Sequence, residues 1–560
     1  MRNGDTPCAR KEAQRIVTGT VALRTAAREA IVLSGSPAAI DTLHAQVHAL
    51  TAVAVAGRAL GVARGPATQR RFNLFLGRLA RATVSRPSPQ PAPVPAAPAD
   101  EPIAPPVAPS PTTLDIAFTG MSPGFALSAP DYGIRCSGGH TSVTVSAPVG
   151  STVSIGGQTP TSGTWSTSDI ELTPGRTVNF TVADAHGSHD YRARCLPDDF
   201  PTYSSTRPGV PQAEWYITTP DLFGTTGPYA AIFDNRGAPV WWQRMASWGM
   251  DAKLLPDGTL AWWVLAREGD VAHYEIHSLD GVLLHRVEIF DGITDNHDLR
   301  SMPNGDYLVL SYVPRTHVDL SAFDGSADAT VLDAEIQEVS PTGSLVWRWN
   351  SSAHITPAET GPWLPSLVAA PQVDLVHINS IELSGNSIVF SARHLNAIYS
   401  IDRTTGDVEW KLGGTPVVES LNIVGDPALG ATSFGGQHDA RILSDGTLTL
   451  HDNGTLRDRA PRAVRYAIDT GAGTATLREQ VQDSGITSSG CCGSARRLTG
   501  GNWVMGWGMN STSTENTPDG TRVFSLTFGG GIGTYRTIPV EPGGLSRTDL
   551  RSEMDQMPLG

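Results

Sequence analysis

The chain has 560 residues, of which 40% are hydrophobic and only 17% charged, and it contains 58 Gly and 41 Pro. Such a composition is typical of turn-rich β structure and argues against a coiled coil or a long helical array. The net charge of −14 disfavours a nucleic-acid-binding protein, and the lack of a GxxxxGK[ST] phosphate loop excludes that class of nucleotide enzyme. No apolar run approaches the roughly 18–20 residues of a transmembrane helix.

The first 112 residues differ in composition from the rest of the chain. Residues 1–83 have apolar residues at helical spacing and 12 basic against four acidic residues, which predicts a basic helical extension. A membrane surface or an acidic partner could bind it, although a solvated extension is favoured. Residues 84–112 are rich in Pro and Ala and predict a semi-rigid linker. No apolar core of a secretory signal is recognisable at the N-terminus.

Residues 113–200 contain short alternating runs separated by turn residues, which predicts a small, Ig-like β-sandwich domain. Cys136 and Cys195 lie near the two ends of this region, where a disulfide would staple its first strand to its last. That bond would place the protein in an oxidising, extracytoplasmic compartment, periplasmic or secreted. The unrecognised signal peptide keeps a cytoplasmic location open.

From residue 201 onwards one pattern recurs, a glycine-containing turn between two apolar runs, typical of a β-hairpin. The turn glycines are Gly258, Gly305, Gly385, Gly446 and Gly501. Their spacing suits one four-stranded sheet per repeat. With one blade shared between residues 213–245 and the strands near 522–540, the pattern predicts a six-bladed β-propeller over 201–560. The predicted fold class is therefore all-β, a propeller preceded by a sandwich domain and a helical extension.

Three histidines occupy the same position in this repeat. His297, His377 and His438 each precede a turn glycine by eight residues, and the same offset gives Met250 and Gly493 in the other two units. The innermost strands of a propeller line its central channel, so equivalent positions form a ring around it. The three histidines are therefore predicted to converge at one mouth of the channel, and their shared register favours a functional site.

Arg393 lies eight residues after Gly385, whereas His377 lies eight before it. In an antiparallel hairpin these positions return to the same end, so the guanidinium is expected beside the imidazole. A guanidinium among imidazoles suits sulfate or phosphate and disfavours a metal ion. An ion pair at the blade edge is the alternative for Arg393. Asn396, three residues on, could donate further hydrogen bonds.

Several motifs follow one another along the propeller region. They are His297-Asp298 with Pro303-Asn304-Gly305, His377-Ile378-Asn379-Ser380, Ser391-Ala392-Arg393-His394-Leu395-Asn396-Ala397-Ile398-Tyr399, Trp410 with Gly413-Gly414, and Gln437-His438-Asp439-Ala440 with Asp452-Asn453-Gly454. Taken in this order, from about residue 213 to 540, they resemble the arylsulfotransferase family. The segment from Tyr191 to Pro201 is similar to the β-domain that precedes the propeller in some members. Residues 1–100 lie outside the resemblance.

The resemblance implies a six-bladed propeller that transfers a sulfuryl group from an aryl sulfate to a phenol without a nucleotide cofactor. It implies a ping-pong cycle in which His438 is transiently sulfated, while His297, His377 and Arg393 hold the sulfuryl oxygens. Asn396 and Asn379 are expected to bind substrate. Neither a metal nor another cofactor is expected, and the partners are two small molecules. The natural donor and acceptor and the oligomeric state are not predicted.

Two other functions remain open. The three histidines could hold a metal, as in an oxygenase or lyase, although Arg393 counts against it. A non-catalytic propeller that binds glycan or protein is the other. Cys491 and Cys492 directly precede Gly493, in the histidine register of another blade, and could form a vicinal disulfide or a thiol pair near the channel mouth. Simple burial of the pair is equally compatible with the sequence.

Overall fold

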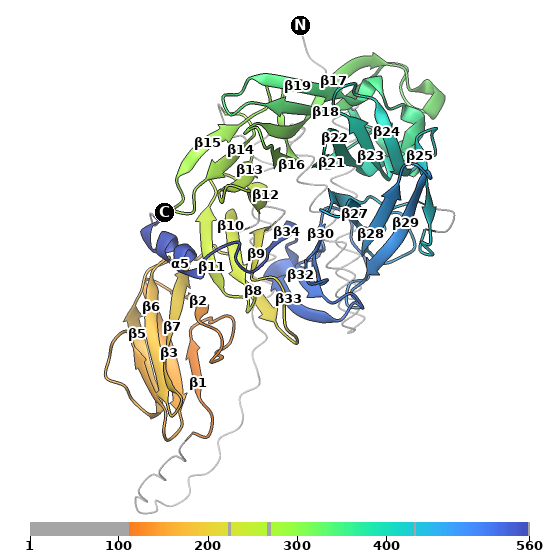
Figure 1. Cartoon of the computed structure of the whole chain (residues 1–560). Helices are drawn as coiled ribbons and strands as arrows, with labels where there is room; N and C mark the ends of the chain where they lie inside the picture. The colour runs from red at the N-terminus through yellow and green to blue at the C-terminus, as the bar shows by residue number, and fades with distance from the viewer. Residues whose placement is uncertain (1–110, 222–225, 266–269, 430–432, 558–560) are drawn as a thin grey trace, which may run out of the picture. The chain divides into compact units, whose positions relative to one another are not determined.

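The computed structural model describes residues 111–560, apart from 222–225, 266–269, 430–432 and 558–560. The extension predicted for 1–83 and nearly all of the linker predicted for 84–112 lie outside the described residues. Strands dominate the described chain, which confirms the all-β class (Figure 1). None of the described helices is long and apolar enough to cross a membrane.

Residues 115–196 form two sheets around one hydrophobic core. In spatial order they are β1 (Asp115–Phe118), β3 (His140–Ala147) and β5 (Gly163–Glu171), and β2 (Asp131–Arg135), β7 (Gly187–Leu196), β6 (Thr177–Asp184) and β4 (Thr152–Ile155). Every second residue of β3 is buried, because successive side chains of a strand point to opposite faces. The rings of Phe180 and Tyr191 stack at 5.0 Å in this core.

A disulfide joins Cys136 to Cys195 within this two-sheet unit. Cys195 lies in β7, and Cys136 directly follows β2, the parallel neighbour of β7. The bond closes a separation of 59 residues. Disulfides persist mainly in oxidising compartments, so this bond supports an extracytoplasmic environment.

Five further sheets form a ring of six blades, because one nine-stranded sheet contains two blades (Figure 1). From inner to outer strand, the first three blades are β34 (Thr534–Val540), β9 (Trp215–Pro220), β10 (Tyr229–Asp234) and β11 (Pro239–Arg244); β12 (Gly249–Leu254), β13 (Leu260–Val264), β14 (His273–His277) and β15 (Leu283–Val287); and β16 (Thr294–Ser301), β17 (Tyr307–Val318), β18 (Ala329–Val339) and β19 (Leu345–Asn350). A short strand, β20 (Val373–Asp374), pairs with β18 in parallel.

The other three blades complete the ring. They are β21 (Ile378–Ser384), β22 (Ser387–Ala392), β23 (Ala397–Asp402) and β24 (Val408–Gly413); β26 (His438–Ile442), β27 (Thr447–Asp452), β28 (Arg462–Asp469) and β29 (Thr474–Val481); and β30 (Ser494–Arg497), β31 (Trp503–Gly506), β32 (Thr512–Asn516) and β33 (Arg522–Phe528). Strand β25 (Ser420–Val424) pairs in parallel with β24 and β29 and so joins two blades.

The ring closes through strands from opposite ends of the propeller sequence. β34 pairs with β9 and so completes a blade whose other strands come from residues 215–244. β33 instead belongs to the preceding blade, where β8 (Tyr203–Thr206) extends the sheet. The C-terminal strands predicted near 522–540 are thus divided between two blades. The pairing of β34 with β9 thus joins the two ends of the propeller sequence within one blade.

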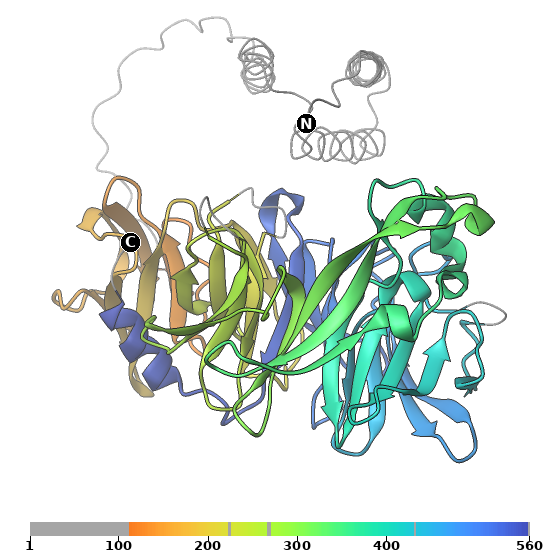
Figure 2. The same ribbon diagram turned by 90° about the horizontal axis from the view of Figure 1, so that it is seen from above.

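The short helices lie between strands and at the C-terminus. They are η1 (Ser321–Phe323), η2 (Ser351–Ala353), η3 (Pro357–Trp363), α4 (Leu364–Leu367), η4 (Arg393–Leu395), η5 (Gly529–Gly531) and α5 (Arg547–Gln556). In both ribbon views α5 lies next to the two-sheet unit (Figure 1, Figure 2). Asp555 pairs there with Arg192 and Arg194, and Arg551 pairs with Asp131. These contacts tie α5 to the two-sheet unit.

The five predicted turn glycines all lie between the first and second strands of a blade. Their φ angles are positive, from 64° at Gly385 to 99° at Gly501. Glycine adopts this left-handed region without the steric penalty of a Cβ atom. The repeat register read from the sequence therefore matches the blades, and it places equivalent residues on equivalent inner strands.

Candidate active site

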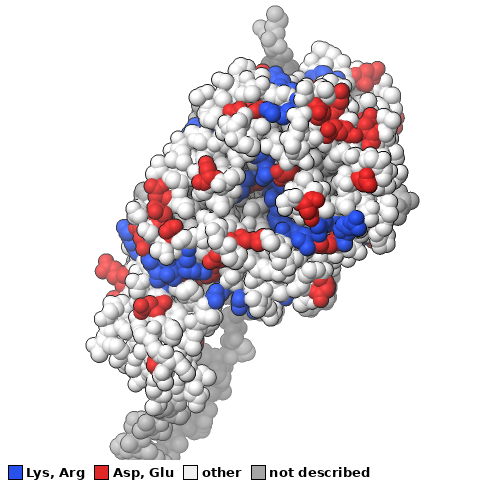
Figure 3. Space-filling view, viewed as in Figure 1, with Lys and Arg blue, Asp and Glu red and all other residues white. Residues whose placement is uncertain are grey.

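The three histidines of the repeat come together at the inner ends of three blades. His297 belongs to β16, His377 directly precedes β21, and His438 is the first residue of β26. The ring centroid of His297 lies 4.7 Å from that of His377 and 6.3 Å from that of His438. Lys and Arg atoms border the hollow at the middle of the ring (Figure 3). Positive charge also lies near the imidazoles, because Arg393 affects the pKa of His377 and Arg536 that of His438.

Each of the three imidazoles is oriented through its Nδ1 atom. The partners are Asp295 Oδ1 for His297 at 2.7 Å, Asp374 Oδ2 for His377 at 2.5 Å, and the Gly493 carbonyl oxygen for His438 at 2.8 Å. A carbonyl or carboxylate oxygen accepts a hydrogen bond from Nδ1–H, which assigns the hydrogen of each neutral ring to that atom. Within the described residues no hydrogen bond reaches the Nε2 atom of any of the three rings.

The pKa values of His438 and His297 are shifted in opposite directions. Burial, reinforced by the positive Arg536 nearby, holds the pKa of His438 well below its usual range. Burial also works against the charged form of His297, but the Asp295 carboxylate outweighs it and raises the pKa of His297. At neutral pH His438 is therefore a neutral base with a free Nε2 lone pair, whereas His297 is the better proton donor.

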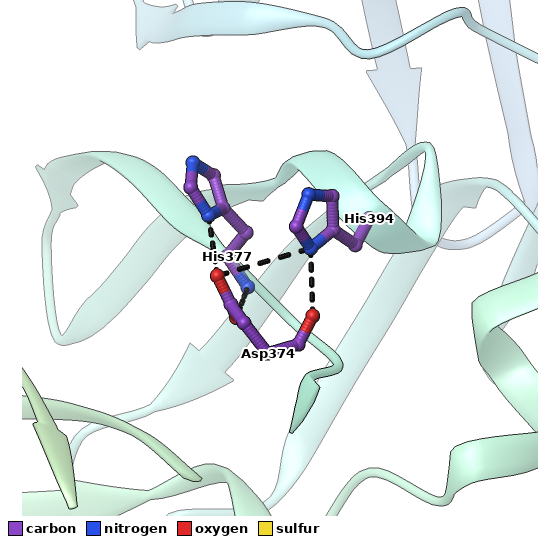
Figure 4. A group of neighbouring side chains, drawn as sticks. All are labelled: Asp374, His377 and His394. Atoms are coloured by element: carbon purple, nitrogen blue, oxygen red, sulfur yellow. Dashed lines mark hydrogen bonds and ion pairs between the residues drawn. The ribbon is translucent and has the colours of Figure 1, made fainter. Parts of the chain in front are cut away.

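Asp374 orients two histidines at once (Figure 4). Its carboxylate binds His377, and its backbone oxygen accepts a hydrogen bond from His394 Nδ1 at 2.7 Å. Burial lowers the pKa of His377, and burial with the neighbouring His377 lowers the pKa of His394 to about 3. Burial would raise the pKa of Asp374, but the two histidines outweigh it and lower that pKa. This cluster therefore carries an ionised carboxylate between largely neutral rings.

Among the residues that the structure describes, Asp374, His377 and His394 form the group of ligand side chains that lie close enough together for a metal ion, within 4.8 Å of one another. The three-histidine set considered from the sequence does not form such a group there. Nδ1 of His377 and of His394 already bonds to Asp374, so an ion would have to displace both hydrogen bonds. The geometry favours orientation of the rings over metal binding.

Arg393 lies beside His377, as the hairpin geometry predicts. Its backbone N–H donates to the His377 carbonyl oxygen at 2.9 Å, and its guanidinium stacks over the Trp363 ring at 4.4 Å. Nη2 donates to the Gly490 carbonyl oxygen at 3.1 Å, whereas the buried Nε has no hydrogen-bond partner. A buried, unpaired guanidinium N–H is costly unless a ligand accepts from it, so this N–H is free to donate to a ligand oxygen.

The two predicted substrate-binding asparagines are engaged with the protein. Asn396 Oδ1 accepts from Trp363 Nε1 and from the Gly436 N–H, both at 2.9 Å. Asn379 is fully buried and donates to the carbonyl oxygen of Gln437 at 2.8 Å, directly before His438. Asn396 thus fixes the mouth around Arg393, and Asn379 fixes the strand that begins with His438.

Buried charged residues form a layer of ion pairs. Two of its members, Asp298 and Asp439, directly follow His297 and His438 in sequence. Asp298 bonds Lys253 at 2.5 Å and Arg441 at 2.8 Å, and Asp439 bonds Arg441 at 2.9 Å and Arg496 at 2.7 Å. These charges come from four different inner strands and fix the blades relative to one another. Asp439 has a φ of 57°, a conformation that non-glycine residues rarely adopt and that surrounding contacts must maintain.

The sequence comparison decides the family. The family model described as "Arylsulfotransferase (ASST)" matches residues 211–532, more than half of the chain and nearly all of the ring of blades. The chain belongs to the arylsulfotransferase family. Comparison with curated proteins finds no match.

Three solved structures resemble this arylsulfotransferase family member weakly. A protein of unknown function from Bacteroides caccae has 11% identity and a TM-score of 0.37, over 59% of this chain and 99% of that one. A gluconolactonase from Xanthomonas campestris has 10% identity and a TM-score of 0.28, over 58% and 90%. A streptogramin B lyase has 11% identity and a TM-score of 0.28, over 58% and 97%.

Some residues of the site in this family member are not evident from the repeat. Tyr535 donates to the backbone oxygen of His297 at 2.8 Å, and its ring lies edge-on to His438 at 5.2 Å. Tyr535 lies in β34, which is not directly preceded or followed by one of the five turn glycines that define the repeat. Asp295 and Asp374 precede their histidines by two and three residues, a spacing that could have indicated them. His394 adjoins Arg393 and could have been included on that ground.

Proposed function

We propose that the protein transfers a sulfuryl group from an aryl sulfate to a phenol in two steps, with His438 as the transient carrier. The observation that carries this proposal is the hydrogen bond from His438 Nδ1 to the Gly493 carbonyl oxygen. It directs the lone pair of the ring to Nε2, and the lowered pKa keeps that atom unprotonated at neutral pH. Membership in the arylsulfotransferase family supports the reaction class.

In the first step, Nε2 of His438 attacks the sulfur atom of the donor. An N–S bond forms, the S–O bond to the aryl group breaks, and its electron pair leaves with the phenolate oxygen. Arg393, through its unpaired Nε, and the neighbouring imidazoles are placed to stabilise the negative charge on the sulfuryl oxygens. His297, whose pKa Asp295 raises, donates a proton to the departing oxygen.

In the second step an acceptor phenol takes the place of the departed phenol, and the reaction runs in the opposite direction. His297, now neutral, accepts the phenolic proton, and the phenol oxygen attacks sulfur. The N–S bond breaks, and its electron pair returns to Nε2 of His438. The carbonyl of Gly493 keeps the Nδ1–H of His438 in place throughout, so the ring does not need to change tautomer between steps.

A turnover assay with 4-nitrophenyl sulfate and phenol, without added nucleotide, tests the proposed function. We expect nitrophenolate release that depends on phenol and survives a chelator. Inactivation by the chelator with restoration by a metal would instead favour an ion at Asp374, His377 and His394. No release with any phenol, in protein that remains folded, would favour a glycan- or protein-binding propeller.

A further inference from the structure

Two adjacent cysteines lie beside the proposed anion-binding arginine and have no role in the proposed transfer. The Sγ atoms of Cys491 and Cys492 lie 2.6 Å apart, and neither residue takes part in the Cys136–Cys195 disulfide. Both side chains are half-buried. Cys492 has a φ of 65°, so the turn that brings the two sulfurs together uses a conformation that non-glycine residues rarely adopt.

The segment around the pair contacts the site at two points and is held by a third hydrogen bond. The Gly490 carbonyl oxygen accepts from Arg393 Nη2, and the Gly493 carbonyl oxygen accepts from His438 Nδ1. The carbonyl oxygen of Cys492 itself accepts from Asn453 Nδ2 at 3.0 Å. Any change in the chemistry of this cysteine pair therefore occurs next to the proposed nucleophile and the anion-binding arginine.

The charged and titratable groups that face Cys491 are Arg393 of η4, His297 of β16 and the adjacent Cys492. Those that face Cys492 are, besides its neighbour, Arg393, Arg536 and Tyr535. Burial lowers the pKa of Arg393, and the two sulfurs have the next largest effects on that pKa and raise it. A thiolate at Cys491 would therefore compete directly with a sulfuryl or sulfate group for the guanidinium.

We propose that Cys491 and Cys492 form a redox-modification site whose vicinal disulfide leaves Arg393 free to bind a sulfuryl group, and whose dithiol form blocks that arginine with the Cys491 thiolate. The proposal rests on the proposed function only in assigning the sulfuryl group to Arg393. The oxidant belongs to the class of small-molecule disulfides, such as oxidised glutathione. The vicinal disulfide is the form expected in the oxidising compartment that the Cys136–Cys195 bond indicates.

The exchange takes place in two balanced steps. The Cys491 thiolate attacks one sulfur of the small disulfide, whose S–S bond breaks and releases one small thiolate. The Cys492 thiol then loses its proton and attacks the Cys491 sulfur, which forms the vicinal bond and releases the second small thiolate. The two protons lost by the protein end on the two small thiols. The protein is oxidised by two electrons, and the small disulfide is reduced by two.

The two sulfur atoms, 2.6 Å apart, need to move little to form a bond, and the resulting vicinal disulfide is readily reduced. Adjacent Cα atoms lie about 3.8 Å apart, below the usual range of about 4.4–6.8 Å between disulfide-bonded residues. Such bonds are strained and belong to the labile, regulatory class. The hydrogen bond from Cys492, reinforced by Arg393, lowers the pKa of Cys491 to about 7, so the attacking thiolate is available near neutral pH.

The test compares oxidised and reduced full-length protein with Cys8→Ser as background, so that only the vicinal pair titrates. Mass spectrometry reports the loss of two hydrogen atoms at residues 491–492 and checks that Cys136–Cys195 stays intact. Calorimetry with inorganic sulfate then measures affinity. We expect reduction to weaken sulfate binding about tenfold or more near pH 8, and to have little effect below about pH 6, where the thiol is protonated. Turnover should follow the same pattern.

Two serine variants separate charge from loop geometry. Cys491→Ser removes the thiolate and should bind sulfate with the affinity of the oxidised protein under both redox conditions. Cys492→Ser keeps the Cys491 thiolate and a hydroxyl donor, so it should bind sulfate weakly near pH 8 even without a reductant. Equal sulfate affinity of the oxidised and reduced proteins, or failure of oxidised glutathione to close the pair, would overturn the proposal. Redox-dependent sulfate binding without turnover in either form would contradict the transferase function alone.

Discussion

The Nδ1 atom of His438 lies 2.8 Å from the carbonyl oxygen of Gly493, so a backbone oxygen fixes the tautomer of this histidine. His297 and His377 are oriented by carboxylates instead. A carboxylate stabilises a charged imidazole, whereas a carbonyl orients the ring with a smaller effect on its pKa. This difference is the structural reason for proposing His438 as the nucleophile and His297 as the group that transfers the proton.

Replacement of His438 by Asn should abolish transfer. The substitution removes the nucleophilic Nε2 and leaves an amide that can still donate a hydrogen bond toward Gly493, so turnover should fall by about 10³-fold or more. The measurement is nitrophenolate release with phenol present. His285→Asn is the matched control, because His285 is bonded to Tyr307 in another blade and should retain wild-type turnover. Near wild-type activity of His438→Asn would rule out this nucleophile.

The dependence of the first step on pH should report His297. A proton donor must be protonated, so kcat/KM for an unactivated donor such as phenyl sulfate should fall as pH rises through the pKa of His297, which lies above its usual value of about 6.5. Asp295→Asn removes the charge that raises this pKa and should move the descending limb to lower pH. Asp257→Asn, an exposed turn residue of another blade, serves as the control.

The donor itself provides a second check on His297. Nitrophenolate is a stable anion that needs little protonation as it leaves, so the descending limb should be weak or absent with 4-nitrophenyl sulfate. The comparison uses the same pH series with both donors. Identical pH profiles for the two donors would show that His297 is not the proton donor.

Arg393 should be needed for its planar guanidinium and not only for its charge. Arg393→Lys keeps the charge but loses the stacking on Trp363, the bond to Gly490 and the unpaired Nε–H. We expect kcat/KM for the donor to fall by about 10²-fold. Arg286→Lys, at an exposed ion pair, should leave kcat/KM unchanged. A loss confined to KM for the phenol would contradict the assignment of Arg393 to the sulfuryl group.

The buried ion pairs of Asp298 and Asp439 should make the thermal stability of the protein sensitive to acid. Burial would raise the pKa of Asp439, but the arginines around it outweigh this and lower the pKa to about 2. A carboxylate with a lowered pKa stabilises the fold above its unfolded pKa of about 4, and this contribution is lost as pH falls from about 4 toward 2. Asp439→Asn should therefore lower Tm at neutral pH, with a cost of about 3–5 kcal/mol from unpaired arginines.

The comparison of Tm at two pH values tests that reasoning. Between neutral and acidic pH, the Tm of the wild-type protein should decrease more than the Tm of Asp439→Asn, because the variant has already lost this carboxylate. Asp257→Asn should behave as wild type at both pH values. An equal loss of Tm in Asp439→Asn and wild type would show that Asp439 contributes nothing to acid unfolding.

The three histidines could be predicted because their position repeats, whereas contacts between distant residues that follow no repeat could not. The turn glycines recur at a fixed place in each blade, so counting from them located His297, His377 and His438 on equivalent strands. Tyr535 lies 238 residues from His297, on the strand that closes the ring, and no local pattern connects them. The partner of His438 is a backbone oxygen, which any residue type supplies, so the sequence around Gly493 has no sign of it.

The measurement that tests the central claim most directly is a rapid-mixing experiment with 4-nitrophenyl sulfate and no acceptor. A covalent carrier predicts a burst of nitrophenolate equal to one per protein molecule, followed by a stop until phenol is added. The peptide that contains His438 should then carry one added sulfuryl group that phenol removes. Absence of a burst, with release only when donor and phenol are both present, would contradict a histidine intermediate and indicate direct transfer between the two substrates.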